Sequence, residues 1–226
     1  ESYRPRALSL PAGRGRVLKR QVDRFVEAAR AEIRKAFESE EYIARRNNTI
    51  KEIQQEKENL ITEINERARE RGFVIQPTPM GLITVPIRDN RPLTEEEFQA
   101  MDKEEQDAVR REQKDLNEKM KETGRQMMSM ERKTQEMIEE LDREVASYTL
   151  DNLLEELRED FGDLPEVMRY LDEMRGDMLE NIQLFRSEEG QPSMPPGIPD
   201  GMPLVPRDDI RFRKYRVNVV VDNTDL

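Results

Sequence analysis

Two long stretches of the chain, residues 16–71 and 102–161, carry apolar residues at helical spacing and contain no proline. The first has no glycine either, and the second has only Gly124. Spacings of three and four put apolar side chains on one face, so each stretch is predicted to be a long amphipathic helix. The first stripe comprises Val22, Phe25, Val26, Ala29, Ile33, Phe37, Ile43, Ile50, Ile53, Leu60 and Ile64, with Lys57 at a seam position; the second comprises Leu116, Met120, Met127, Met130, Thr134, Met137, Leu141, Val145 and Tyr148.

The composition limits what these helices can pack against. Charged residues make up 38% of the chain, hydrophobic residues 35% and aromatic residues 5%. This is too little apolar material for a compact globule, but it suffices for the narrow seam between two paired helices. Long disorder is the other fate of so polar a chain. The helical periodicity favours helices over disorder.

Residues 72–93, between the two helical stretches, have a different pattern. Gly72 stands where a helix would end. Two β-prone runs, residues 73–75 and 82–87, flank the turn signal Pro77-Thr78-Pro79-Met80-Gly81, which predicts a small β-hairpin. Because Pro86 has no backbone N–H, it is expected to confine the second run to an edge strand.

The two helical stretches are similar in length and a compact tip joins them. They are therefore predicted to pair as an antiparallel intramolecular coiled coil, and an intermolecular coiled coil is the alternative. Beyond residue 161, Asp163 fits an N-cap and Pro165 the first turn of a further helix that ends near Phe185. Its apolar residues and those at the end of the preceding helix predict a small helical bundle at the base; they are Leu150, Leu153, Leu154, Leu157, Phe161, Val167, Met168, Leu171, Met174, Met178 and Ile182.

The remaining segment of the chain changes character again. Residues 186–209 hold six prolines and three glycines, which indicates a linker or long loop. Residues 215–221 read as a strand with no partner in the chain, and the first residue is not Met, so we expect a piece of a longer protein. The predicted organisation is a lead-in (1–15), a coiled-coil hairpin (16–161) with its tip at 72–93, a base helix (162–185), a linker (186–209) and a strand (210–226).

Several chemistries are absent from the sequence. There is no Cys and no His, which excludes disulfides, thiolate metal sites and the commonest general base. No phosphate-binding loop of the Gly-x-x-x-x-Gly-Lys-Ser/Thr type occurs. The run Val219-Val220-Val221-Asp222 is similar to a magnesium-holding strand end, but Asn223 follows where a hydrolytic Glu would be expected, so an ordinary strand end is favoured. We predict no catalytic, cofactor-binding or metal-ligating residue in this chain.

The charge and the hydropathy limit the classes of partner that this chain can bind. The formal net charge is -11, which repels phosphate backbones. One basic cluster, Arg4, Arg6, Arg14, Arg16, Lys19, Arg20 and Arg24, has no aromatic residue among its last five members, so nucleic-acid contact is disfavoured. No apolar run approaches the roughly 18 residues of a membrane span, and the first residues lack a signal-peptide core. We expect a cytoplasmic protein that does not enter the membrane.

Four segments, in this order, resemble a known family. They are Arg4-Pro5-Arg6-Ala7-Leu8-Ser9-Leu10-Pro11-Ala12-Gly13-Arg14-Gly15; Thr78-Pro79-Met80-Gly81; Leu164-Pro165-Glu166-Val167 followed by Asn181-Ile182; and Tyr215-Arg216-Val217-Asn218-Val219-Val220-Val221-Asp222-Asn223. Together they look like the middle region of Lon-related ATP-dependent serine proteases that carry a long helical insertion in the AAA+ module.

The patterns above predict a mainly α fold: a long antiparallel coiled-coil hairpin with a β-hairpin tip, a short helical bundle at the base and a C-terminal strand. The resemblance implies that this fold is an insertion in the AAA+ module. Residues 1–15 and 210–226 would then connect to the AAA+ core. It also implies a parent protease that forms a homo-oligomeric ring, with ATP and Mg²⁺ as cofactors and a Ser-Lys dyad outside this chain. None of those catalytic motifs has a matching position here, so the chain would be a non-catalytic insertion that gates or recognises protein substrates.

The tip offers the candidate contact residues. Phe73, Ile75, Met80 and Leu82 place apolar side chains on a small hairpin, and exposed apolar patches often mark protein partners. The same residues could instead cap the end of the coiled coil, since a two-stranded hairpin is marginal alone. A free-standing coiled-coil scaffold or holdase chaperone is the alternative function.

Overall fold

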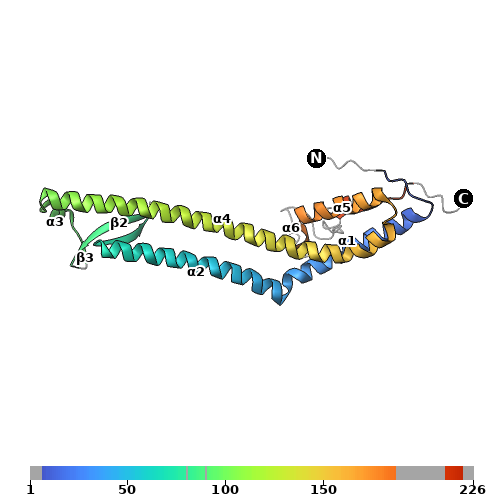
Figure 1. Cartoon of the computed structure of the whole chain (residues 1–226), viewed down its shortest axis with the longest axis horizontal. Helices are drawn as coiled ribbons and strands as arrows, with labels where there is room; N and C mark the ends of the chain where they lie inside the picture. Colours follow the sequence, from blue (N-terminus) through green and yellow to red (C-terminus); the bar gives the residue numbers. More distant parts are fainter. Residues whose placement is uncertain (1–6, 80, 90, 187–211, 221–226) are drawn as a thin grey trace, which may run out of the picture. The chain divides into compact units, whose positions relative to one another are not determined.

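The computed structural model describes residues 7–79, 81–89, 91–186 and 212–220 (Figure 1). These residues are mainly helical, as predicted, and the chain divides into two compact units. Unit 1 comprises Glu1–Arg45 and Glu139–Leu226, and unit 2 comprises Arg46–Ile138. The elements are α1 (Arg14–Glu38), α2 (Glu40–Glu70), β1 (Phe73–Thr78), β2 (Gly81–Arg88), β3 (Arg91–Pro92), α3 (Glu95–Gln99), α4 (Lys103–Phe161), α5 (Pro165–Glu180), α6 (Gln183–Arg186) and the 3₁₀ turn η1 (Arg213–Tyr215).

A break at Ser39 separates α1 from α2, so the prediction of one helix over residues 16–71 is wrong. Ser39 has extended backbone angles (φ −65°, ψ 144°). Its Oγ donates a hydrogen bond to the carbonyl of Ala36 (2.7 Å) and accepts one from the backbone N–H of Tyr42 (3.2 Å). Ser39 thus caps α2, and Glu40 and Glu41 add favourable charge to its first turn. The helix breaks without proline or glycine because this side chain satisfies a backbone donor that the break exposes.

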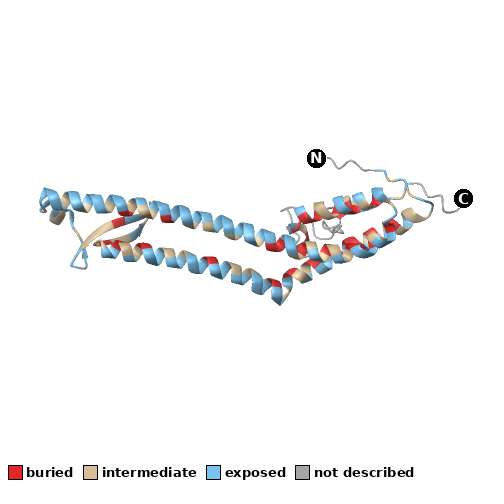
Figure 2. Ribbon diagram, in the orientation of Figure 1, coloured by how far each residue is buried: buried red, intermediate tan, exposed pale blue. Residues whose placement is uncertain are grey.

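The core of unit 1 lies between α1, the end of α4, α5 and α6 (Figure 2). The predicted stripe from Val22 to Phe37 is buried there, and the predicted bundle is confirmed, with Leu153 and Met168 partly buried beside it. The buried side chains are Leu18, Val22, Phe25, Val26, Ala29, Ile33, Phe37, Tyr42, Leu141, Ala146, Leu150, Leu154, Leu157, Phe161, Val167, Leu171, Met174, Met178, Leu179, Ile182, Phe185, Phe212 and Tyr215.

The start of α5 differs from the prediction in its cap. Pro165 occupies the first turn as expected, but the N-cap position belongs to Leu164, which offers no side-chain hydrogen bond. Asp163, the predicted cap, instead accepts a hydrogen bond from the guanidinium of Arg14 at 3.0 Å. The carboxylate is therefore engaged by α1 and does not cap α5.

In unit 2, α2 and α4 pair in antiparallel fashion, as predicted. Lys57 Nζ lies 3.3 Å from Glu131 Oε1, and Arg71 Nη1, just beyond the end of α2, lies 3.1 Å from Glu112 Oε2. Residue numbers thus rise along α2 while they fall along α4. A small core of Ile64, Ala68, Phe73 and Leu116 closes this pair where the sheet begins.

Four side chains assigned to the helical seam are exposed instead; they are Ile43, Ile50, Met137 and Tyr148. A straight helix slips by about 20° for every seven residues, so a strict seven-residue repeat leaves the seam after three or four repeats. Ile64 is buried, but Ile43, three repeats earlier, is 45% exposed and Tyr42 is buried in its place. Tyr148 is likewise 72% exposed, four repeats after Met120.

The tip is a three-stranded antiparallel sheet in the order β1-β2-β3. The predicted hairpin is confirmed by β1 and β2, and β3 is an addition. Because β2 is the central strand, the prediction that Pro86 confines it to an edge is wrong. The N–H of Ile87 donates to Gly72 O (2.7 Å) on the β1 side, so the nitrogen of Pro86 faces the β3 side. There Pro86 accepts through its carbonyl, from the N–H of Leu93 at 2.8 Å, and needs no donor.

The described part of the predicted strand 210–226 is not a strand. Residues 213–215 form η1, and residues 216–220 belong to no sheet among the described residues. Phe212 and Tyr215 are buried in unit 1, and the ring of Phe212 packs on that of Phe185 with 5.2 Å between centroids. Aromatic burial therefore holds this segment in a tight turn, whereas a strand would need a ladder partner. Residues 1–6, 187–211 and 221–226, with most of the predicted linker, lie outside the described residues, and Arg186 ends α6.

Candidate protein-binding surface

Ser147 in unit 1 has charged neighbours, but it is not arranged as a nucleophile. Its Oγ accepts a hydrogen bond from Arg175 (2.6 Å) and donates one to Asp151 (3.3 Å). The pKa of Asp151 lies below its ordinary value, chiefly because Arg175 donates hydrogen bonds to its carboxylate. An arginine cannot act as a base, and a carboxylate stabilised in this way is a weak one. The cluster is an ion-pair network that ties α4 to α5.

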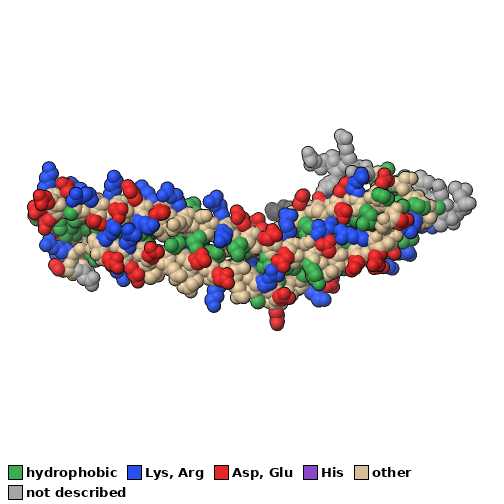
Figure 3. Space-filling view, viewed as in Figure 1, with side chains coloured by type: hydrophobic (Ala, Val, Ile, Leu, Met, Phe, Trp, Pro, Cys, Tyr) green, Lys and Arg blue, Asp and Glu red, His purple; other side chains and the backbone are tan. Residues whose placement is uncertain are grey.

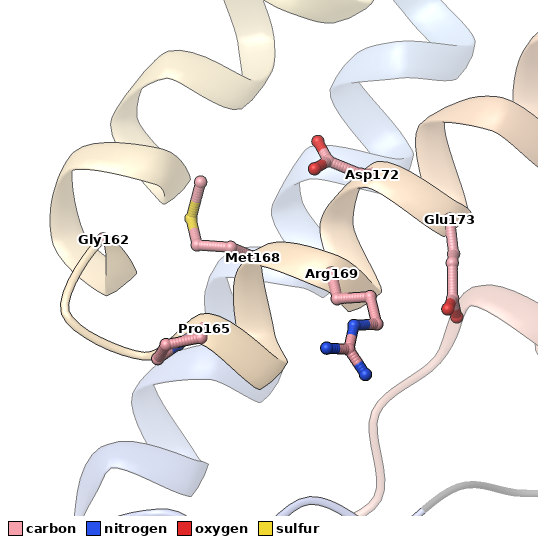
Figure 4. A pocket seen from close by; sticks show the side chains of 6 residues that line it. All are labelled: Gly162, Pro165, Met168, Arg169, Asp172 and Glu173. Atoms are coloured by element: carbon pink, nitrogen blue, oxygen red, sulfur yellow. The ribbon is translucent and has the colours of Figure 1, made fainter.

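A hollow of about 700 Å³ lies along the α4–α5 turn (Figure 4). It is lined by Gly162, Pro165, Met168, Arg169, Asp172 and Glu173. In Figure 4, Arg169 and Asp172 point in opposite directions, so their charges do not converge on one position. Asp172 accepts a hydrogen bond from Arg158 at 3.0 Å instead. The hollow therefore lacks the convergent groups that a small-molecule site needs.

The described residues contain no group of three or more acidic side chains placed to hold a metal ion. None of the described helices is long and apolar enough to cross a membrane. Along the face in view in Figure 3, basic and acidic side chains alternate over both units. A chain expected to be non-catalytic can still bind proteins through exposed apolar side chains.

The tip sheet holds the candidate contact residues in different environments. Phe73 is 2% exposed and packs with Ile64, Ala68 and Leu116, while Ile75 is partly buried against the same cluster. These two residues act as a cap on the helices of unit 2. Leu82 is 63% exposed. Met80 lies outside the described residues.

The register of the hairpin divides its side chains between two faces. Thr78 pairs with Gly81, Ile75 with Thr84 and Phe73 with Pro86. Because directly paired residues share a face and side chains alternate along a strand, Phe73, Ile75 and Thr84 lie on one face. We call this the inner face, since Phe73 packs on α2 and α4.

Thr84 fastens the inner face to α4. It is 5% exposed, and its Oγ1 donates a hydrogen bond to Asn117 Oδ1 at 3.0 Å. Gln113 donates to the carbonyl of Thr84 at 2.9 Å. A buried threonine with both polar groups satisfied is stable in this position. The sheet is therefore fixed to α4 through its inner face.

The opposite face of the sheet is apolar as well, and we call it the outer face. Its residues on β1 and β2 include Val74, Ile83, Val85 and Ile87. Ile83 is 44% exposed, and the other three side chains are half-buried. None of the four belongs to either core cluster. Reasoning from the sequence did not select these residues; the register of the hairpin, which sets the two faces, was the signal that could have found them.

Comparison with known proteins gives one finding. Residues 1–25 match the family model described as Lon-like LonC helical domain. The matched segment covers the lead-in and the first part of α1. No curated protein matches the chain. The match supports assignment of the chain to a helical region of a Lon-like protease.

Proposed function

We propose that this chain is the non-catalytic helical insertion of a Lon-like ATP-dependent serine protease, and that it gates or recognises protein substrates. The observation that carries the proposal is the LonC-type match over residues 1–25, which runs directly into α1. The helical pair of unit 2 and its apolar tip agree with a structural arm that touches polypeptides. Cleavage would take place in the parent protease outside this chain, in the cytoplasm.

The cofactors that such a parent implies would bind outside this chain. No phosphate-binding loop occurs in its sequence, and the described residues hold no acidic trio. ATP and Mg²⁺ would therefore act in other domains of the ring, and the contribution of this chain would be binding and steric. Exposed apolar side chains at the tip would contact unfolded segments, whose own apolar side chains are accessible.

Replacing residues 72–91 by a short Gly/Ser turn in the parent protease tests the proposal. Degradation of an unfolded protein should fall, while cleavage of a small fluorogenic peptide should persist, because a peptide needs no recognition by the arm. Circular dichroism must show that the helices remain. Equal rates of the variant and the parent on the unfolded protein would leave the tip as a cap of the helices only.

A free-standing scaffold or holdase is the second candidate, and the same apolar outer face favours it. The flanking reading frame separates the two. A phosphate-binding loop upstream and a Ser-Lys peptidase downstream would support the protease; an initiator Met beside Glu1 and a stop codon after Leu226 would support the scaffold.

A further inference from the structure

We propose that the outer face of the tip sheet, formed by Val74, Ile83, Val85 and Ile87, binds short extended apolar segments of non-native polypeptides. This inference rests on the proposed function and names its substrate class. It places the contact on the face opposite to Phe73, Ile75 and Leu82.

The outer face is more apolar than the stability of the tip requires. An antiparallel sheet that packs on one side normally alternates apolar residues inside with polar residues outside. Here Phe73, Ile75 and Thr84 supply the packing side. Polar residues at positions 74 and 85 would leave that packing intact, yet both positions carry valine. Apolar side chains on the second face add nothing to either core cluster.

Hydrogen bonding and packing hold the outer face in shape. Val74 pairs with Val85 and Gln76 with Ile83 across the two strands, so their side chains form neighbouring rows. The buried Thr84 hydroxyl and carbonyl fix β2 to α4 from the other side. β-branched side chains have few rotamers, so this surface loses little conformational freedom on binding.

The size of the outer face identifies the occupant. The six side chains of this face on β1 and β2, which include the polar Gln76 and Thr78 beside the four apolar residues, cover roughly 17 Å by 10 Å, on the order of 200 Å². A stable protein pair buries about 800 Å² on each partner, so this face is too small to hold a second copy of the chain. Two copies with a net charge of -11 each also repel one another. A short extended segment with an apolar side chain at every second residue fits the area and the spacing of the rows.

Weak binding is the expected consequence of this size. A contact of about 200 Å² supports transient binding that many different segments can share. A surface that samples unfolded chains needs such broad tolerance, and it discriminates against folded proteins because their apolar residues are buried. The exposure and the spacing of apolar residues in the bound segment therefore define the substrate class, and no single sequence is required.

Binding by the 226-residue chain tests the inference. The probe is a fluorescein-labelled decapeptide that alternates Val with Ser, measured by fluorescence anisotropy in 0.5 M salt to suppress charge attraction. The variant Ile83→Thr/Val85→Thr keeps β-branched side chains and removes apolar surface. We expect its Kd to rise at least tenfold. Met128→Thr and Met137→Thr, both on α4, remove exposed apolar surface elsewhere and should leave Kd within twofold.

Circular dichroism must show equal helix content in all variants. If the double variant loses the sheet, the single variant Val74→Thr on β1 replaces it, with an expected rise in Kd of at least threefold. An unchanged Kd, or an equal rise in Met128→Thr, overturns the inference. Self-association of the chain at tens of micromolar that the double variant abolishes also overturns it, because the occupant would then be a second copy. The binding measurement uses the 226-residue chain and no protease. Normal degradation by a parent protease whose tip has been replaced would refute the proposed function, and it would not change the measured Kd of the peptide.

Discussion

Replacing Asp142 by alanine should destabilise unit 1 by about 2–3 kcal/mol. The Asp142 side chain is 7% exposed and forms an ion pair with Arg186, whose side chain is 28% exposed. Asp142 also accepts a hydrogen bond from the Tyr42 hydroxyl at 2.6 Å, and Arg186 donates to that hydroxyl at 3.1 Å. The guanidinium lies 4.6 Å from the ring centroid of Phe37. One carboxylate thus joins α2, α4 and α6 beside the break at Ser39.

The magnitude follows from what remains after the change. Removing one partner of a buried ion pair costs about 3–5 kcal/mol, because the other charge stays desolvated. Arg186 is partly exposed, so water recovers some of its solvation and lowers the expected cost. The matched control is Glu144→Ala on the same helix. Its pair with Arg45 also joins α4 to α2, but the two side chains are 58% and 45% exposed, so water screens the pair and the loss should be clearly smaller than that of Asp142→Ala.

Urea unfolding followed by tyrosine fluorescence measures this loss selectively. The chain has no Trp, and every tyrosine belongs to unit 1; they are Tyr3, Tyr42, Tyr148, Tyr170 and Tyr215. The fluorescence transition therefore reports unit 1, while circular dichroism reports the helices of both units, which need not unfold together. A loss below about 0.5 kcal/mol for Asp142→Ala, or one equal to that of Glu144→Ala, would refute a structural role for the buried pair.

Two further changes are predicted from local geometry. Gly124→Ala should stabilise α4 by about 1 kcal/mol, because the added Cβ would meet nothing within 4 Å. Gly162→Ala is the control and should give no gain, since its Cβ would lie 3.0 Å from the Arg158 carbonyl oxygen. Thermal unfolding followed by circular dichroism compares the two variants. Hydrogen bonds, chiefly from Arg91 and next from Thr94, lower the pKa of Glu97 from 4.5 to about 2. The ionised Glu97 therefore stabilises the fold above pH 4.5, and this stabilisation is lost as the pH falls from 4.5 towards 2. Glu97→Gln should accordingly lower the melting temperature at pH 7 and lower it much less at pH 2, and an equal deficit at both values would contradict this coupling.

The long helices could be predicted because their patterns are local. α4 begins at Lys103, one residue from the expected start. A Thr94–Glu97 capping box starts α3, with the N–H of Thr94 3.0 Å from Glu97 Oε2. The break at Ser39 escaped prediction although its signal has the same form. A serine followed by Glu40 and Glu41 is a helix start, just as Thr94 followed by three glutamates is. Apolar residues keep their helical spacing on both sides of Ser39, so the pattern predicted one continuous helix.

Side-chain contacts between distant segments could not be predicted from the sequence. Asp142 occupies a seam-adjacent position on α4, where a solvated acidic residue is the usual expectation. Its burial depends on Tyr42, one hundred residues earlier, and on Arg186, forty-four residues later. Phe212 and Tyr215 likewise lie beside or in a β-prone segment, but their burial in unit 1, with Phe212 packed on Phe185, holds residues 213–215 in a 3₁₀ turn. In each case a tertiary contact overrides the local preference.

The tip shows why residue type alone cannot choose the face of a sheet. Its inner face buries Thr84, while its outer face presents Val85, the next residue and the more apolar one. A pattern that sorts residues by hydrophobicity would place these two the other way round. Asn117 and Gln113 on α4 reverse the order because they satisfy the polar groups of the threonine. A sequence that buries a threonine and leaves valines half-exposed departs from the rule for one-sided sheets, and such departures concentrate where a surface serves a partner.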